Sequence, residues 1–238
     1  MVGNNLFSSF TVSETSIKER NILKNVYGWM AAGLGVTGVT AFSVASNPNM
    51  VKVLLGSSFS LIMLFVVQFG LVIYLSSKIK TMSRNTATFA FLGYAFVTGI
   101  TFSSIFFAFS IATIFKAFIT SGAMFMGMAF YAQTTKKDLS GVGYYARMAL
   151  WGIIISMFIN FFFKSAMLDY FISVIGVFVF LGLTAWDVQK IKRTNDNYGS
   201  QMSEIDIHRV SIYGALTLYL DFINMFLFML RIFGSSNK

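Results

Sequence analysis

YFISVIGVFVFLGLTAWDVQ, residues 170–189, decides the fold of this chain, because it places one charged residue, Asp187, in an otherwise uncharged and mostly apolar stretch. A helix of about 20 apolar residues crosses the roughly 30 Å hydrocarbon core of a membrane. The stretch ALTLYLDFINMFLFML, residues 215–230, repeats this pattern around Asp221. An acid at the centre of a membrane-spanning helix costs about 2.5–3.5 kcal/mol. Two such acids in successive segments therefore mark the expected functional site.

The composition indicates a membrane protein rather than a soluble one. The chain has 238 residues, of which 56% are hydrophobic and 11% are charged, whereas soluble domains carry about 25% charged residues. Apolar runs such as residues 60–75 do not alternate as barrel strands do, so we expect helices. The absence of cysteine excludes disulfides and thiolate metal sites.

The apolar runs predict an all-α membrane protein, a bundle of seven transmembrane helices. Residues 86–135 are too long a run for one helix, so we divide them near residues 108–116 on length alone. The remaining spans are expected at residues 22–46, 53–75, 145–163, 170–189 and from about 210 or 215 onward. Residues 1–20 then form a polar cytoplasmic tail, residues 21–234 the transmembrane domain and residues 235–238 a short extracytoplasmic tail.

The basic residues set the expected orientation. The net charge is +9, but the Lys and Arg side chains lie in short loops between apolar runs and form no single patch, so we expect no nucleic-acid partner. Of the 18 basic residues, 18 − 5 = 13 fall on the N-terminal side of the membrane, and five fall on the other side: Lys52, Lys116, Lys164, Arg231 and Lys238. Cytoplasmic loops carry the excess of Lys and Arg. The N-terminus is therefore predicted inside and the C-terminus outside.

The two aspartates lie on polar helix faces. In the last span Thr217, Asp221 and Asn224 recur at spacings of four and three and share one face. In the preceding span Thr184 and Asp187 lie three positions apart and also share one face. Such faces point into a bundle. Two adjacent carboxyl groups in a dry site cannot both ionise cheaply, so the pair would share a proton when closed and repel when ionised. The alternative is a purely structural contact between helices.

The depth of the pair depends on where the last span begins. A start at Val210 places Asp221 roughly 16 Å deep and offsets it from Asp187, whereas a start near Ala215 places it about 9 Å deep and permits contact. The predicted pair therefore requires the second register. Carboxylates, a hydroxyl and an amide oxygen suit a hard cation, so Asp187 and Asp221 are candidate calcium ligands; the residues leave the identity of the cation open.

Four short motifs agree in order and spacing with a known family. They are TGIT at residues 98–101, KKDLS at 136–140, WDVQKI at 186–191 and LYLDFIN at 218–224. Over residues 21–234 the chain resembles the Bax inhibitor-1 family, in its bacterial YccA-like branch. The resemblance implies a multi-pass bundle in the bacterial inner membrane, with the last helix central.

The resemblance also implies a function and further site residues. The function is a calcium leak, gated by protonation of Asp187 and Asp221, with no resident cofactor. The resemblance implies a basic latch among Lys78, Lys80 and Arg84, and a pathway position at Gln68, where other members carry an acid. The expected partners are the lipid bilayer, calcium and protons.

Two other functions were weighed. Bacterial relatives are linked to regulation of a membrane-bound AAA protease, so this protein could be an interaction partner whose handle is the tail at residues 1–20. An intramembrane aspartyl protease also uses two membrane aspartates, but its Gly-x-Gly-Asp motif is missing before Asp187 and Asp221. We therefore expect no enzyme.

Overall fold

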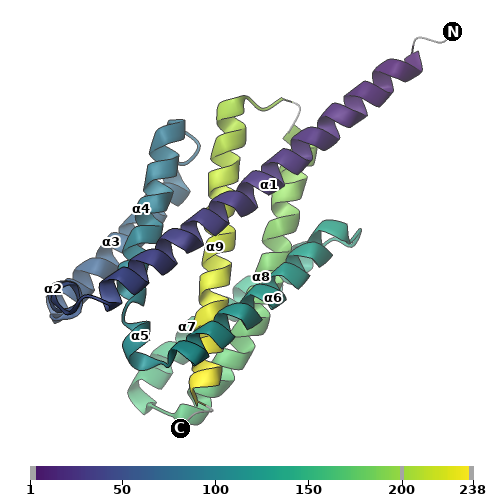
Figure 1. Cartoon of the computed structure of the whole chain (residues 1–238). Helices are drawn as coiled ribbons and strands as arrows, with labels where there is room; N and C mark the ends of the chain where they lie inside the picture. Colours follow the sequence, from purple (N-terminus) through teal and green to yellow (C-terminus); the bar gives the residue numbers. More distant parts are fainter. Residues whose placement is uncertain (1–3, 199–200, 236–238) are drawn as a thin grey trace.

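The computed structural model describes the backbone of residues 4–198 and 201–235 and the side chains of residues 22–198 and 201–234. Within these ranges the chain is helical and has no strand (Figure 1). Seven segments of the described chain are long and apolar enough to cross a membrane, which confirms the predicted seven-helix membrane protein. The helices are α1 (Asn4–Ala45), α2 (Pro48–Leu55), α3 (Ser58–Lys78), α4 (Arg84–Phe102), α5 (Ile105–Ala108), α6 (Ile111–Thr134), α7 (Ser140–Phe163), α8 (Ala166–Tyr198) and α9 (Glu204–Ser235).

The long apolar run at residues 86–135 divides where predicted, between α5 and α6. The side chain of Ser110 accepts a hydrogen bond from the backbone N of Thr113 (3.2 Å) and so caps α6. α4 and the short α5 together form the preceding span, Arg84–Ala108. Asn47, Ser57 and Ser83 cap α2, α3 and α4 in the same way. The Ser110 cap is thus the physical reason that the run divides here, at a place that its length alone had predicted.

The ends of the expected segments need correction at three places. The predicted second span, residues 53–75, is two helices, α2 and α3, and its membrane-spanning part is Ser58–Lys78. α1 begins at Asn4, so residues 4–20 of the expected N-terminal tail have a helical backbone. α9 ends at Ser235. Residues 1–3, and residues 236–238 of the expected C-terminal tail, lie outside the described residues.

The hairpin of α8 and α9 differs most from expectation. The polar segment predicted at residues 190–209 is mostly helical, because α8 continues to Tyr198 and α9 begins at Glu204. Ser203 accepts a hydrogen bond from the backbone N of Asp206 (3.2 Å) and donates its hydroxyl to the Asp206 carboxylate (2.7 Å), as a helix-capping serine does. α9 therefore begins before both expected starts of the last span, Val210 and Ala215, and both helices extend past their apolar parts.

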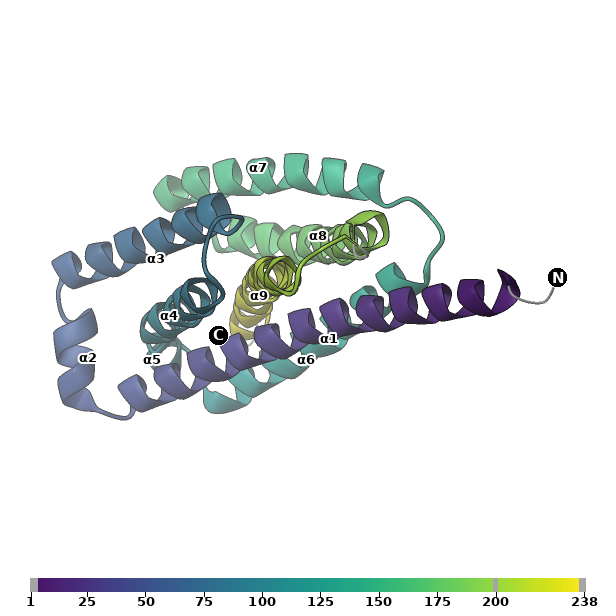
Figure 2. The same ribbon diagram turned by 90° about the horizontal axis from the view of Figure 1, so that it is seen from above.

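α9 is the central helix, as the resemblance implied. It contacts α1, α4, α6 and α8, and Figure 2 shows it between these helices when the bundle is seen from above. Aromatic rings fill the contact with α6, where Phe222 meets Phe118 and Phe125 edge to face at centroid distances of 5.5 and 5.8 Å. α9 is also the most buried of the seven spans.

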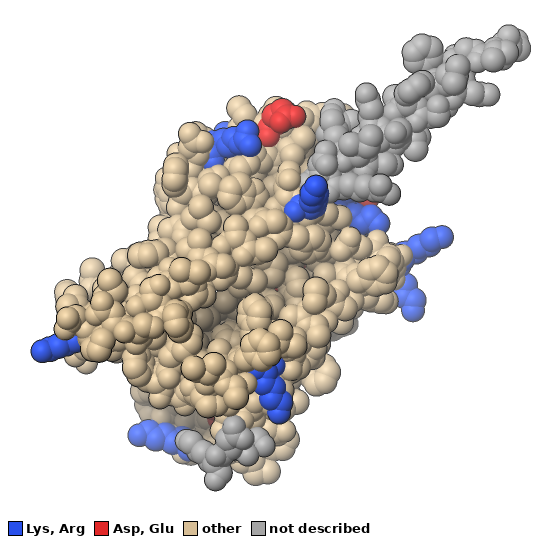
Figure 3. Space-filling view, viewed as in Figure 1, with Lys and Arg blue, Asp and Glu red and all other residues tan. Residues whose placement is uncertain are grey.

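The outer helices present apolar side chains to the membrane. α3 and α7 are the least buried spans, and their exposed residues include Phe59, Phe65, Trp151 and Phe158. The face drawn in Figure 3 has a broad uncharged middle, with Lys and Arg at its margins. This distribution is typical of a protein whose middle lies in hydrocarbon and whose charged side chains reach water.

Candidate functional site

Asp187 and Asp221 meet across the α8–α9 hairpin. Both are buried, with 7% and 5% of their surface exposed, and their carboxyl groups form a side-chain hydrogen bond. Because an ionised carboxylate only accepts hydrogen bonds, this contact requires a proton on one of the two groups. The contact forms although α9 starts at Glu204, and α8 likewise continues past its expected end, to Tyr198.

The pair is not fully satisfied. Oδ2 of Asp221 is buried and has no hydrogen-bond partner among the described residues. Buried polar atoms in a settled structural network nearly always have a partner, and an unpartnered one costs about 1–3 kcal/mol. No N–H or hydroxyl group of the described residues therefore bonds to this oxygen, and the contact with Asp187 is the hydrogen bond that the Asp221 side chain makes across the hairpin.

The threonines and the asparagine of the predicted polar face bond to their own helices. The hydroxyl of Thr184 donates to the backbone carbonyl of Phe180 (2.8 Å), and the hydroxyl of Thr217 donates to the backbone carbonyl of Tyr213 (3.0 Å). The amide of Asn224 donates to the backbone carbonyl of Leu220 (2.8 Å). These three side chains share the face of the aspartates and make no hydrogen bond to them within the described residues, so they line the site and do not hold the carboxyl groups.

Two cavities lie on either side of the pair. The Asp187 cavity, of about 500 Å³, is lined by Ser76, Ile79, Lys80, Asp187, Lys190, Ile191, Thr194, Arg209, Val210, Tyr213, Gly214 and Thr217. The Asp221 cavity, of about 410 Å³, is lined by residues of α7, α8 and α9 that include Asp221, Asn224 and Arg231. Thr217 lines both cavities. Each cavity is therefore lined by one aspartate of the pair, and the two cavities share Thr217 in their lining.

One of the three candidates for the predicted basic latch lines the Asp187 cavity. This residue is Lys80, whereas Lys78 and Arg84 do not line it. None of the three forms an ion pair with Asp187 among the described residues, so the latch stays a prediction.

Gln68, the candidate pathway residue, lines neither cavity. It donates to the hydroxyl of Thr98 (3.2 Å) and accepts from the hydroxyl of Thr101 (3.3 Å), so it links α3 to α4.

Two other cations lie near Asp187. Lys190 and Arg147 are the basic groups whose charges act on its carboxyl group. Both also lie over the ring of Trp186, at 4.9 and 4.4 Å from its centroid, where a cation is attracted to the aromatic face. The sequence spacing indicates Lys190 as a neighbour, because a residue three positions after Asp187 shares its helix face. Arg147 had no local signal, since it comes from α7.

The loop between α6 and α7 is fastened to α8 beside the site. Gln189 donates to the carbonyl of Lys137 (2.8 Å) and accepts from the backbone N of Leu139 (2.8 Å). Arg193 pairs with Asp138 at 2.6 Å. Hydrogen bonds from Ser140 and then Arg193 lower the pKa of Asp138 to about 2. Sequence reasoning missed this contact, because its partners lie about 50 residues apart in the chain.

The opposite face of α9 carries a second polar contact. The hydroxyl groups of Tyr219 and Thr37 are 2.6 Å apart, and Thr37 also donates to the carbonyl of Ala95 (2.9 Å). Tyr219 is fully buried and meets the rings of Phe91 and Tyr94 edge to face. This contact ties α9 to α1 and α4, and it joins residues too distant in sequence for a local pattern to reveal.

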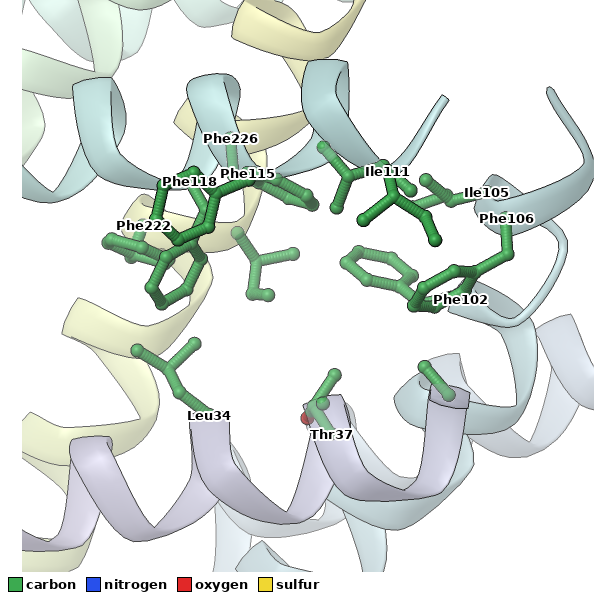
Figure 4. Close-up of a pocket in the computed structure, with 14 residues that line it drawn as sticks. Leu34, Thr37, Phe102, Ile105, Phe106, Ile111, Phe115, Phe118, Phe222 and Phe226 are labelled. Carbon is green, nitrogen blue, oxygen red and sulfur yellow. The ribbon is translucent and has the colours of Figure 1, made fainter. Parts of the chain in front are cut away.

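Beside Thr37 lies an apolar cavity of about 250 Å³ (Figure 4). Its walls come from α1, α4, α5, α6 and α9, and apart from Thr37 they carry no polar side chain. Figure 4 shows Leu34 and Thr37 on one side and a row of phenylalanines, among them Phe118 and Phe222, on the other. This cavity has no group that could hold an ion or a proton, so we place no chemistry there.

The carboxyl pair could contact a metal ion but does not form a complete metal site. In the part of the chain that the structure describes, no three His, Cys, Asp or Glu side chains gather to hold a metal. Calcium takes six to eight oxygen ligands, so Asp187 and Asp221 would supply only some of them. The arrangement suits an ion that keeps most of its water rather than one held permanently.

Comparison with known proteins agrees with this architecture. The chain matches the family described as "Inhibitor of apoptosis-promoting Bax1" over residues 19–238. It is 44% identical to inner membrane protein YbhL of Escherichia coli over 216 residues, 90% of this chain and 91% of the relative.

Two further relatives come from other bacteria. An uncharacterized protein of Borreliella burgdorferi is 40% identical over 92% of this chain and 96% of its own length. YrjE of Lactococcus lactis is 38% identical over 88% of each chain. None of these three names denotes an enzyme. The match across almost the whole chain, together with the seven-helix bundle and its central last helix, shows that this chain belongs to the Bax inhibitor-1 family of membrane proteins.

Proposed function

We propose that this protein is a passive leak for calcium across a bacterial inner membrane, gated by protonation of the Asp187–Asp221 pair. The observation that carries the proposal is the position of the pair, which is buried and hydrogen-bonded between two cavities. The unpartnered Oδ2 of Asp221 adds support, because it leaves the pair short of a stable structural arrangement.

In the closed state one shared proton joins α8 to α9. When that proton leaves, two negative charges remain within hydrogen-bond reach at a buried site. Repulsion between like charges is much stronger in such a site than in bulk water. We expect it to part the two helices locally, so that the Asp187 and Asp221 cavities join beside Thr217. The leak therefore rises as the pH rises.

The ionised pair would then attract a cation. Two carboxylates and the amide oxygen of Asn224 are hard oxygen ligands, which favour calcium over softer metals. The side chains of Lys190 and Arg147 oppose this attraction at Asp187, because their charges already act on that carboxyl group. A calcium ion should accordingly interact more strongly with Asp221 than with Asp187.

Calcium flux into liposomes tests the proposal. Purified protein should pass more calcium at neutral than at acid pH, and Asp221→Asn should make the flux independent of pH in that range, because the amide does not titrate. Asp196→Asn is the matched control, since this aspartate is exposed on α8. A pH dependence that survives Asp221→Asn would refute the gating mechanism, and the absence of flux from the wild-type protein would refute the leak.

The orientation in the membrane remains a prediction, with the N-terminus in the cytoplasm and the C-terminus outside. The distribution of basic residues supports it. A reporter that is active only in the cytoplasm should be active when fused before Met1 and silent when fused after Lys238. The reverse result would contradict the predicted orientation.

A second function, as a regulator of a membrane-bound AAA protease, is favoured by one observation. The backbone of α1 is helical from Asn4, well before its membrane span begins at Ile22, so a helical segment is present at the position proposed as the handle. Cross-linking in native membranes should recover the protease through residues 4–20. Recovery that is unchanged when residues 4–20 are deleted would contradict this role for the segment.

A further inference from the structure

The Asp187 cavity is more basic than a cation pathway requires. Its lining contains three cationic side chains, Lys80, Lys190 and Arg209, and one acidic side chain, Asp187. The net formal charge of these four side chains is +2. The single acid is already hydrogen-bonded to Asp221. A cavity with this lining favours anions over cations, so its charge calls for a ligand besides the transported ion.

The cationic groups come from three separate elements and converge on one space. Lys80 lies in the turn after α3, Lys190 on α8 and Arg209 on α9. Arg209 is held in place by bonds from Nε to the carbonyl of Met82 (2.7 Å) and from one terminal nitrogen to Asp206 (3.0 Å). An arginine has five N–H donors, so most of this guanidinium remains available.

The other donors at the cavity are also uncommitted. Lys80 makes no hydrogen bond or ion pair among the described residues, and neither does the hydroxyl of Tyr213. Lys190 contacts only the ring face of Trp186 and the charge of Asp187. Two ammonium groups, a guanidinium and a phenol hydroxyl around one cavity are the donor set that phosphate oxygens accept from.

The cavity also lies where a lipid can reach it. α3 packs on α2 and α4 and makes no comparable contact with α8 or α9, so the cavity occupies the gap between α3 and the hairpin. Ser76 and Lys80 at its edge are exposed. The cavity is at the end of the bundle that holds the α8–α9 turn, and basic pockets between transmembrane helices at that level bind anionic headgroups.

We propose that the Asp187 cavity is a binding site for a phosphate group, carried by the headgroup of an anionic phospholipid or present as free phosphate. Lys80, Lys190 and Arg209 bind the phosphate oxygens, and Tyr213 donates its hydroxyl to one of them. The bound phosphate offsets the positive lining beside Asp187. That last consequence rests on the proposed leak, whereas the binding itself does not.

Binding to the full-length protein in detergent, followed by native mass spectrometry, tests the site without any flux measurement. Wild-type protein should retain phosphatidylglycerol in preference to phosphatidylcholine. Lys80→Gln with Lys190→Gln should weaken that binding roughly tenfold, because each basic residue near an anionic headgroup contributes favourably. Lys80→Arg with Lys190→Arg should retain it. The control is Lys116→Gln with Lys164→Gln, which removes the same charge near the opposite end of the bundle.

A second arm separates the two sources of phosphate. Inorganic phosphate is titrated against wild-type and Lys80→Gln/Lys190→Gln protein by calorimetry. If the double substitution weakens the retention of phosphatidylglycerol, the ligand is a lipid headgroup. If it removes the heat of binding of inorganic phosphate, the ligand is free phosphate. The proposal is wrong if the binding of neither ligand depends on Lys80 and Lys190. It is also wrong if the protein retains phosphatidylglycerol and phosphatidylcholine equally. Failure of calcium flux alone would leave these binding results intact.

Discussion

The two polar faces of α9 differ in how well they are satisfied. On the face toward α1 and α4, the hydroxyl of Tyr219 is 2.6 Å from that of Thr37, and the rings of Phe91 and Tyr94 pack against Tyr219. On the face toward α8, Asp221 shares a hydrogen bond with Asp187 while its Oδ2 has no N–H or hydroxyl partner among the described residues. The first face fixes the position of α9, and under the proposed gating the second is a contact that a single proton would make or break.

The largest effect is expected on the fixed face. Tyr219→Ala removes a fully buried ring and should lower the free energy of unfolding by about 3–5 kcal/mol, as the loss of large buried side chains does. Unfolding in mixed detergent micelles, followed by circular dichroism, measures this change. Tyr213→Ala, one cavity-lining residue on the same helix, is the control and should cost clearly less. Equal losses at both positions would remove the distinction between the faces.

The next largest effect concerns the packing of α8 against α9. A Cβ atom at Gly176 would lie 2.6 Å from the ring of Phe228, whereas one at Gly152 would meet nothing within 4 Å. Gly176→Ala should therefore lower the free energy of unfolding by about 1–3 kcal/mol through overpacking. Gly152→Ala should leave it unchanged or raise it slightly. If the two variants unfold alike, the hairpin is less tightly packed than the structure indicates.

A smaller effect of the opposite sign is expected on the changeable face. Asp221→Asn keeps the shape of the side chain, and its amide can donate to Asp187 without a shared proton. At neutral pH we expect the free energy of unfolding to rise by roughly 1 kcal/mol, although the same variant removes the pH dependence of the flux. A loss of stability as large as that of Tyr219→Ala would show that the pair is a structural contact.

The smallest effect lies outside the membrane, at the exposed pair of Asp138 and Arg193. The folded-state pKa of Asp138 is about 2, below the ordinary 3.8, so its contribution to stability is present above pH 3.8 and is lost as the pH falls toward 2. Asp138→Asn should be slightly less stable than wild type at neutral pH and equal to it near pH 2. A difference that persists at the lowest pH would contradict this assignment.

Sequence patterns predicted the spans well because they depend on local composition. Hydropathy located the seven helices, and the Ser110 cap explains why the run at residues 86–135 divides where its length suggested. Helix ends were less accurate, because polar residues after Gln189 and before Val210 continue the helices beyond the apolar limit. For this reason α9 begins before both Val210 and Ala215, and the aspartates meet without a helix that starts near Ala215.

The site itself was only partly predictable. The periodicity of Asp221 and its neighbours placed the acids on inward faces, but the partners of the acids depend on tertiary packing. Arg147 reaches Trp186 only because Gly143 lets the ring of Trp186 pack closely against α7. Lys80 could not be separated from Lys78 and Arg84 by spacing, because the turn after α3 determines which of them lines the cavity.

The hydrogen bonds of Gln189 to the 135–139 loop have a mechanical consequence. They fasten the end of α8 to the α6–α7 connection only two residues after Asp187, while Thr37 and Tyr219 fasten α9 to α1. In the proposed opening, neither helix would slide by itself, and the movement would be a tilt of one fastened group of helices against the other. The hinge of that tilt would run along the line where α8 and α9 touch.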